Sequence, residues 1–237
     1  MKPIQLHYKT TRAQIDPHGA WITELSDEKG DIFYPRREVM LYDNSMKLRG
    51  GCHVCVPNFG PGGESGQPQH GYGRKTDWQV AETTANHASL VLAGDDDKYK
   101  HMSAMLSITL DDRALLMTLS VINKGKDPIR VAPAFHPYFA TTDIHNVFLD
   151  DEELNFQELD GTTFTSGECH DIVMPSRSLT IASKDLHNWA VWTDLLDNYV
   201  CVEPTLSGYA FTRETPADSE MLGENEQRTY SMALNWN

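Results

Sequence analysis

The stretch MLSITLDDRALLMTLSVI, residues 105–122, decides the fold class. In its first half Leu106, Ile108 and Leu110 alternate with polar residues, which is the pattern of a strand with one buried face. The segment Asp111-Asp112-Arg113 then predicts a hairpin loop, and residues 115–122 form a second apolar run. We therefore expect two antiparallel strands joined by a tight turn.

The rest of the chain repeats this signal and shows little helical periodicity. Short runs of β-branched, aromatic and aliphatic residues are separated by Gly, Asp, Asn and Pro, at residues 20–25, 89–93, 146–149, 178–181, 189–193 and 199–202. Many short strands at close spacing predict an all-β sandwich or barrel-like domain. The sequence has no internal repeat and no low-complexity linker, so we expect one domain over residues 1–237.

Composition narrows the function classes. The 237 residues include 34 Asp plus Glu against 20 Lys plus Arg, a net charge of −14, and 40% of them are hydrophobic. This apolar content is too high for a disordered chain, and so acidic a protein repels phosphate backbones, so we expect no nucleic-acid partner. The sequence starts without the apolar core of an export signal and has no run that could span a bilayer, so we expect a cytoplasmic protein with no membrane partner.

Four cysteines occur at positions 52, 55, 169 and 201. With no export signal we expect free thiols rather than disulfides. Cys52 and Cys55 form a single C-x-x-C without the second pair that a structural zinc site requires. If they lie on a strand, residues three apart face opposite sides, so we expect neither a metal site nor redox chemistry from this pair.

Three basic or imidazole groups lie in glycine-rich segments. Arg49 precedes two glycines, and His70 and Arg74 lie in a Gly/Pro-rich stretch, residues 60–73 and beyond, that we interpret as a long functional loop. A guanidinium fork suits carboxylate, phosphate or paired sugar hydroxyls. From these residues alone, an ordinary surface turn is the alternative interpretation.

Two further titratable residues lie beside apolar runs. His136 lies between aromatic residues in PAFHPYF, residues 133–139, and Glu203 ends the predicted strand 199–202. Each by itself fits a structural role, as a core histidine or a solvated strand end. Together they fit general acid–base chemistry on a polyhydroxylated ring. The sequence contains no G-x-S-x-G nucleophile elbow, phosphate-binding P-loop or H-E-x-x-H zinc helix.

Four ordered motifs carry a family resemblance. RGGCHVCVPNFG from residue 49, HGYGRKTDW from residue 70, FHPYF from residue 135 and VCVEP from residue 200 resemble the aldose 1-epimerase (galactose mutarotase-like) superfamily. The resemblance is closest to the glucose-6-phosphate 1-epimerase, or hexose-6-phosphate mutarotase, branch. It implies a large antiparallel β-sandwich that binds a sugar or sugar phosphate and needs no metal and no cofactor.

The resemblance also implies residue roles. His136 matches the general acid and Glu203 the general base, while His70 would bind the sugar. Arg49 and Arg74 match the arginines that contact phosphate, and Asp194 or Asp197 matches a sugar-binding carboxylate. Glu203 would take the anomeric hydroxyl proton while a protonated His136 gives a proton to the ring oxygen, which opens the ring.

Several alternatives stay open at this point. The substrate is a neutral hexose or a hexose 6-phosphate, and the sequence does not predict the oligomeric state. A non-catalytic carbohydrate-binding protein on the same scaffold is one competing function. A lyase, or another sugar-processing enzyme on a related β-sandwich, is the other.

Overall fold

The predicted hairpin is the centre of one sheet. In the computed structural model, which describes residues 2–94, 98–156 and 161–237, β10 (Met102–Asp111) pairs with β11 (Ala114–Asn123) in antiparallel register from Met102↔Asn123 to Asp111↔Ala114. The turn between them places Arg113 at φ 52°, in the left-handed region. The hairpin prediction is therefore confirmed, with strands slightly longer than expected.

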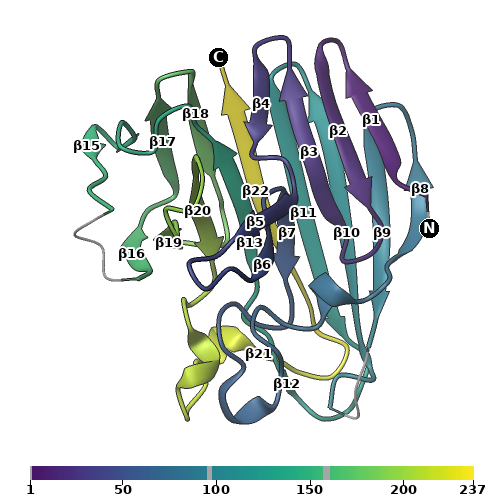
Figure 1. The fold of residues 1–237 in the computed structure, drawn as a ribbon. Helices are drawn as coiled ribbons and strands as arrows, with labels where there is room; N and C mark the ends of the chain where they lie inside the picture. Colours follow the sequence, from purple (N-terminus) through teal and green to yellow (C-terminus); the bar gives the residue numbers. More distant parts are fainter. Residues whose placement is uncertain (1, 95–97, 157–160) are drawn as a thin grey trace.

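Two nine-stranded antiparallel sheets pack face to face (Figure 1). The first contains β1 (Ile4–Tyr8), β2 (Thr11–Asp16), β3 (Trp21–Asp27), β4 (Gly30–Phe33), β7 (Cys52–Cys55), β13 (Ala134–Ala140), β16 (Thr163–Ser166), β19 (Asn188–Trp192) and β20 (Tyr199–Thr205). The second contains β8 (Gln79–Thr83), β9 (His87–Ala93), β10, β11, β14 (Phe148–Leu149), β15 (Glu152–Glu153), β17 (Cys169–Met174), β18 (Arg177–Ala182) and β22 (Gln227–Trp236). This arrangement is the all-β, large antiparallel β-sandwich that we expected.

Short elements complete the fold. Two small ladders pair β5 (Arg37–Met40) with β6 (Met46–Arg49) and β12 (Ile129–Arg130) with β21 (Met221–Leu222). The helices described are four single 3₁₀ turns: η1 (Gly63–Ser65), η2 (Gly73–Lys75), η3 (Ala210–Thr212) and η4 (Asp218–Glu220). Among the described residues, no helix has the length and apolar character needed to cross a membrane.

The core lies between the two sheets because each strand alternates apolar and polar residues. On β10 the side chains of Ala104, Leu106, Ile108 and Leu110 are buried, while the residues between them lie on the outer face. The same alternation puts Phe135 and Phe139 of β13 into this core. Their neighbours Ala134, His136 and Tyr138 therefore project from the opposite face of the first sheet.

Strand β7 separates the two cysteines of the C-x-x-C as expected. Cys52 packs into the main core, whereas Cys55 belongs to a small cluster with Phe59 and Ala134 on the other face. All four cysteines are free thiols. The two side chains therefore lie on opposite faces of the sheet, as their spacing on a strand predicts.

The strand predicted over residues 199–202 is longer in the structure and includes Glu203. Glu203 lies inside β20 rather than at its end, because Thr205 continues the pairing with both Ala134 of β13 and Asn188 of β19. Pro204 lacks only its own N–H and stays in register opposite Trp189. The carboxylate is therefore 2% exposed rather than solvated.

Candidate active site

A cavity of about 180 Å³ lies on the outer face of the first sheet. Five predicted site residues line it: Arg49, His70, Arg74, His136 and Glu203. Its other lining residues are Lys47, Phe59, Gln69, Tyr138, Thr162, Trp192 and Tyr209. Residues from β6, β13, β19, β20 and the loop after β7 thus meet in one place.

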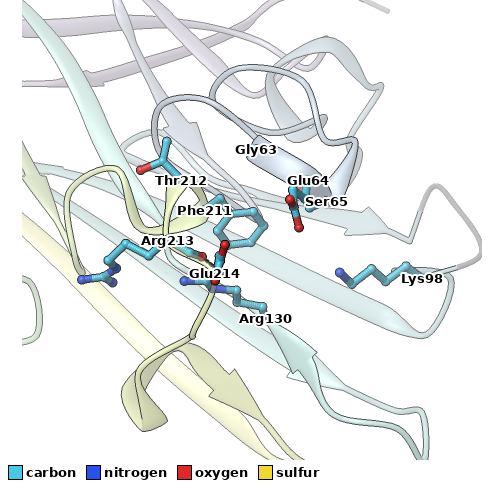
Figure 2. A pocket seen from close by; sticks show the side chains of 9 residues that line it. All are labelled: Gly63, Glu64, Ser65, Lys98, Arg130, Phe211, Thr212, Arg213 and Glu214. Carbon is cyan, nitrogen blue, oxygen red and sulfur yellow. Dashed lines mark hydrogen bonds between the residues drawn. The ribbon is translucent and has the colours of Figure 1, made fainter.

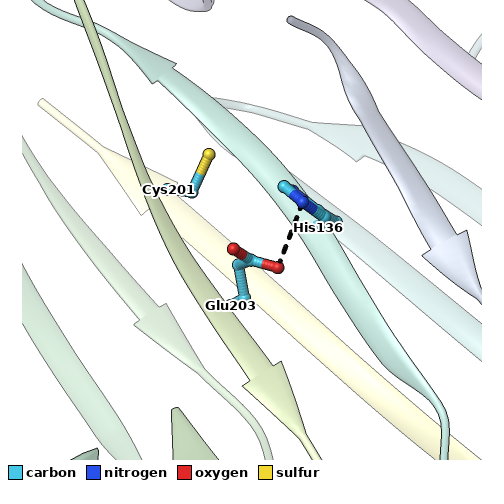
Figure 3. A group of neighbouring side chains, drawn as sticks. All are labelled: His136, Cys201 and Glu203. Carbon is cyan, nitrogen blue, oxygen red and sulfur yellow. Dashed lines mark ion pairs between the residues drawn. The ribbon is translucent and has the colours of Figure 1, made fainter. Parts of the chain in front are cut away.

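Strand pairing brings the two predicted acid–base residues together. Since Ala134 pairs with Thr205 and Tyr138 with Cys201, the same register puts His136 opposite Glu203. The His136 Nε2 atom lies 3.4 Å from Glu203 Oε2, and both side chains are almost fully buried (Figure 3). The two groups can therefore share a proton and act on one small ligand.

Burial sets the protonation of this pair. It lowers the pKa of His136 well below its usual value, and the neighbouring His70, Arg74 and Arg49 lower it further. Burial also raises the pKa of Glu203 well above its usual value. Both shifts favour the neutral form of each group, which is an uncharged imidazole next to a protonated carboxyl group.

Stacked rings hold the His136 imidazole on both sides. The ring of Tyr138 is nearly parallel to it, with 8° between the planes and 4.8 Å between centroids. The ring of His53, directly opposite on β7, stacks at the same distance and in turn packs on Trp21 at 3.9 Å. This packing fixes the direction in which Nε2 points toward Glu203.

His70 has a defined tautomer. Its Nδ1 accepts a hydrogen bond from the backbone N–H of Gly60 at 3.2 Å, so the proton of the neutral ring lies on Nε2. Burial, followed by the nearby charge of Arg74, lowers the pKa of His70 to about 3. The Gln69 side-chain amide lies 3.3 Å from His70 Nε2, so a ligand oxygen in the cavity would compete with Gln69 for this donor.

The loop that carries His70 and Arg74 is held by close backbone contacts. Gly71 has φ 72°, and a Cβ at this position would lie 2.0 Å from the carbonyl oxygen of Val56. His70 itself has φ 63°, and the Trp78 indole donates to the Gly73 carbonyl oxygen at 2.8 Å. The glycine is required here because no side chain fits between the loop and β7.

Asp194 pairs with Arg49 and does not line the cavity. Its carboxylate accepts a hydrogen bond from Arg49 Nε at 2.7 Å and another from the Tyr199 hydroxyl. The Arg49 guanidinium also lies 5.4 Å above the Trp192 ring. The alternative, Asp197, pairs with Arg37 and Tyr34. Both aspartates therefore anchor the β5–β6 ladder through its arginines.

Arg74 differs from Arg49 because it faces the cavity without an acidic partner. Among the described residues no carboxylate lies within ion-pair distance of it, and its buried Nε has no hydrogen-bond acceptor. Lys47, at the rim, is exposed and likewise forms no ion pair within the described part of the chain. The cavity thus presents two uncompensated positive charges in a protein of net charge −14.

Sequence reasoning missed the aromatic wall of the cavity. Tyr138 could have been found, since it lies two residues from His136 on the same strand and must share its face. Trp192 pairs with Cys201 across β19 and β20, and Tyr209 stacks on Phe59 at 5.5 Å. These contacts depend on which strands are neighbours, which the sequence alone does not specify.

A larger cavity, of about 440 Å³, lies beside η3 and η1 (Figure 2). Its principal cation, Arg130, is fully engaged: it donates to Glu220 at 2.7 and 2.9 Å and to the backbone carbonyls of Ala210 and Arg213. Glu220 is completely buried and also accepts from Arg213. We interpret this network as structural, because it ties β12 to the loops around η3 and η4.

Comparisons with known proteins agree with the fold. Similar solved structures include a galactose mutarotase-like protein from Lactobacillus casei, with 14% identity, TM-score 0.83 and full coverage of both chains. A galactose mutarotase related enzyme from Lactobacillus acidophilus has 15% identity, TM-score 0.83 and coverage of 100% and 97%. A putative aldose 1-epimerase from Escherichia coli has 17% identity, TM-score 0.77 and coverage of 100% and 99%.

At such low identities, these TM-scores show a shared fold and nothing more. A comparison with curated proteins gives no match. The sequence pattern of the aldose 1-epimerase family, however, matches residues 3–204, which is most of the chain. With the β-sandwich and the site described, this match shows that the chain belongs to the aldose 1-epimerase family.

Proposed function

We propose that this family member interconverts the α and β anomers of an aldohexose 6-phosphate by acid–base ring opening. The observation that carries the proposal is that His136 and Glu203 face each other at 3.4 Å in a cavity also lined by Arg74, which has no carboxylate partner among the described residues. A neutral aldohexose is the second candidate, because the charge of Arg49 is already compensated by Asp194.

In the proposed mechanism Glu203 acts as base and His136 as acid. Glu203 takes the proton of the anomeric hydroxyl, and the electron pair of that O–H bond forms the aldehyde carbonyl. The bond between C1 and the ring oxygen breaks, and His136 gives its proton to that oxygen. Rotation about C1–C2 and the reverse proton transfers close the ring as the other anomer. Each placed proton transfer contributes about 10²- to 10⁴-fold in rate.

These roles require the proton of the pair to lie on His136, whereas burial by itself favours the form with the proton on Glu203. The reaction starts from ionised Glu203 and protonated His136 and, after ring opening, leaves a neutral carboxyl group and a neutral imidazole. Both forms carry the same net charge, so the pair never exposes an uncompensated charge to the buried site. Neutral His70, with its proton on Nε2, would hold a sugar oxygen in place.

The cations at the rim support a phosphorylated substrate. A phosphate needs donors that are not already used, and Arg74 and Lys47 meet this requirement among the described residues. The general negative field of the protein opposes a dianion, so recognition must come from these short-range contacts.

Polarimetry tests the proposal. Fresh α-glucose 6-phosphate and fresh α-glucose are each followed with wild type, Glu203→Gln and His136→Asn, and with His101→Asn as a control for loss of an exposed histidine. We expect both site variants to lose about 10²-fold or more in rate, and the control to keep its rate. Near-full mutarotation by either site variant would contradict the assigned roles.

The same assay separates the competing functions. Sugar binding by calorimetry without accelerated rotation would identify a carbohydrate-binding protein. An unsaturated or cleaved product, detected by ultraviolet absorbance or mass spectrometry, would identify a lyase. A faster reaction with α-glucose than with its 6-phosphate would favour the neutral aldose.

A further inference from the structure

We propose that His136, Cys201 and Glu203 form a zinc-binding site at the floor of the cavity, and that the bound metal inhibits the enzyme. Their ligand atoms all lie within 4.8 Å of one another. Cys201 and Glu203 are two residues apart on β20 and project to the side where His136 leaves β13 (Figure 3). Strand pairing thus builds the site without any loop.

The distances suit a tetrahedral ion. With bonds of about 2.0–2.3 Å to N, O and S, zinc ligands are about 3.3–3.6 Å apart, and His136 Nε2 and Glu203 Oε2 are already 3.4 Å apart. The widest separation in the trio, up to 4.8 Å, closes with a side-chain movement of about 1 Å. Three protein ligands leave the fourth position free for water or a sugar hydroxyl.

The ligand types select the metal. A thiolate, an imidazole and a carboxylate together match zinc, whereas magnesium and calcium prefer oxygen ligands alone. The trio is buried, and Glu203 Oε2 accepts no hydrogen bond from the described residues. Zinc with one thiolate and one carboxylate has no net charge, so binding leaves no unpaired ion in the low-dielectric site.

Inhibition is expected because the metal would bind the same two side chains, His136 and Glu203, that move protons in the reaction. This part of the inference rests on the proposed function. A zinc ion on His136 and Glu203 occupies both the acid and the base, so neither can move a proton to or from the sugar. Metal binding itself is independent of that function. Cys201 is fully buried, does not line the cavity and has no role in the proposed reaction.

Cobalt(II) titration tests binding directly, because a cobalt–thiolate bond gives a near-ultraviolet charge-transfer band. We expect this band in wild type, its loss in Cys201→Ala, and its retention in Cys52→Ala, whose thiol lies on the opposite, core side of the sheet. We also expect zinc to displace cobalt, and Glu203→Gln to lower cobalt affinity at least about tenfold. No band in wild type, or a band retained in Cys201→Ala, would overturn the site.

Rate measurements test the inhibition separately. Zinc should reduce mutarotation by wild type and by Cys52→Ala, and EDTA should restore it, while the ratio of rates with and without zinc should be near one for Cys201→Ala. Equal zinc sensitivity of Cys201→Ala and wild type would refute inhibition through this site. If no variant catalyses mutarotation, the cobalt band still decides the metal site, so the two proposals fail independently.

Discussion

Replacing Arg74 by Gln should weaken catalysis on a phosphorylated sugar far more than on a neutral one. The side chain is half-buried at the cavity and has no carboxylate partner among the described residues, so its charge is available to a ligand. A hydrogen bond to a charged group contributes about 1.5–3 kcal/mol. At about 1.36 kcal/mol per factor of ten, this is about a 10- to 150-fold loss in kcat/KM.

The assay measures kcat/KM by polarimetry for α-glucose 6-phosphate and α-glucose with wild type, Arg74→Gln and Lys75→Gln. Lys75 is the next residue on η2, is exposed and does not line the cavity, so it controls for the same change in net charge. We expect a loss specific to Arg74 and to the phosphate. An equal loss on both sugars would place Arg74 on the sugar ring, and no loss would remove it from recognition.

The rate of mutarotation should depend on pH as a bell. Because burial lowers the pKa of His136 and raises that of Glu203, the acid limb of kcat/KM reports proton uptake by His136 and should lie below pH 6.5. An acid limb at or above pH 6.5 would contradict this effect of burial on His136. Gly71→Ala should lose both stability and activity, whereas Gly66→Ala, with a similar φ but nothing within 4 Å, should lose only about 1–2 kcal/mol; equal urea midpoints would contradict the contact with Val56. Arg177→Met should lower the free energy of unfolding by about 3–5 kcal/mol, because it removes the cation that compensates the buried Asp27 side chain and leaves only the neutral donors Trp236 and Lys29 N–H; a loss below 1 kcal/mol in urea titration would refute this.

Much of the sandwich can be predicted from local pattern. The alternation of Leu106, Ile108 and Leu110, followed by a short polar turn, is sufficient for the β10–β11 hairpin, because a half-buried strand has no other periodicity. The β5–β6 ladder was not predicted. Three of its residues, Met40, Met46 and Leu48, are apolar yet exposed, so a prediction based on burial does not recognise the ladder.

The residue types of the candidate site could be predicted from the sequence, but the contacts that its residues make with one another could not. The motifs selected Arg49, His70, Arg74, His136 and Glu203, and all five line one cavity. That Asp194 pairs with Arg49, or that Cys201 lies beside the acid–base pair, follows from the pairing of β19, β20 and β13. Contacts between strands distant in sequence are set by topology, which residue spacing within one strand does not encode.

The alternation along β13 has an evolutionary consequence. Phe135 and Phe139 pack in the apolar core, while His136, between them in sequence, faces the cavity. A register slip of one residue would turn His136 into the core and the phenylalanines toward the cavity. Selection for a foldable protein therefore also preserves the orientation of the acid. A substitution on this strand must therefore keep the register, whereas a substitution of the exposed Lys47 at the rim alters the cavity without disturbing the core.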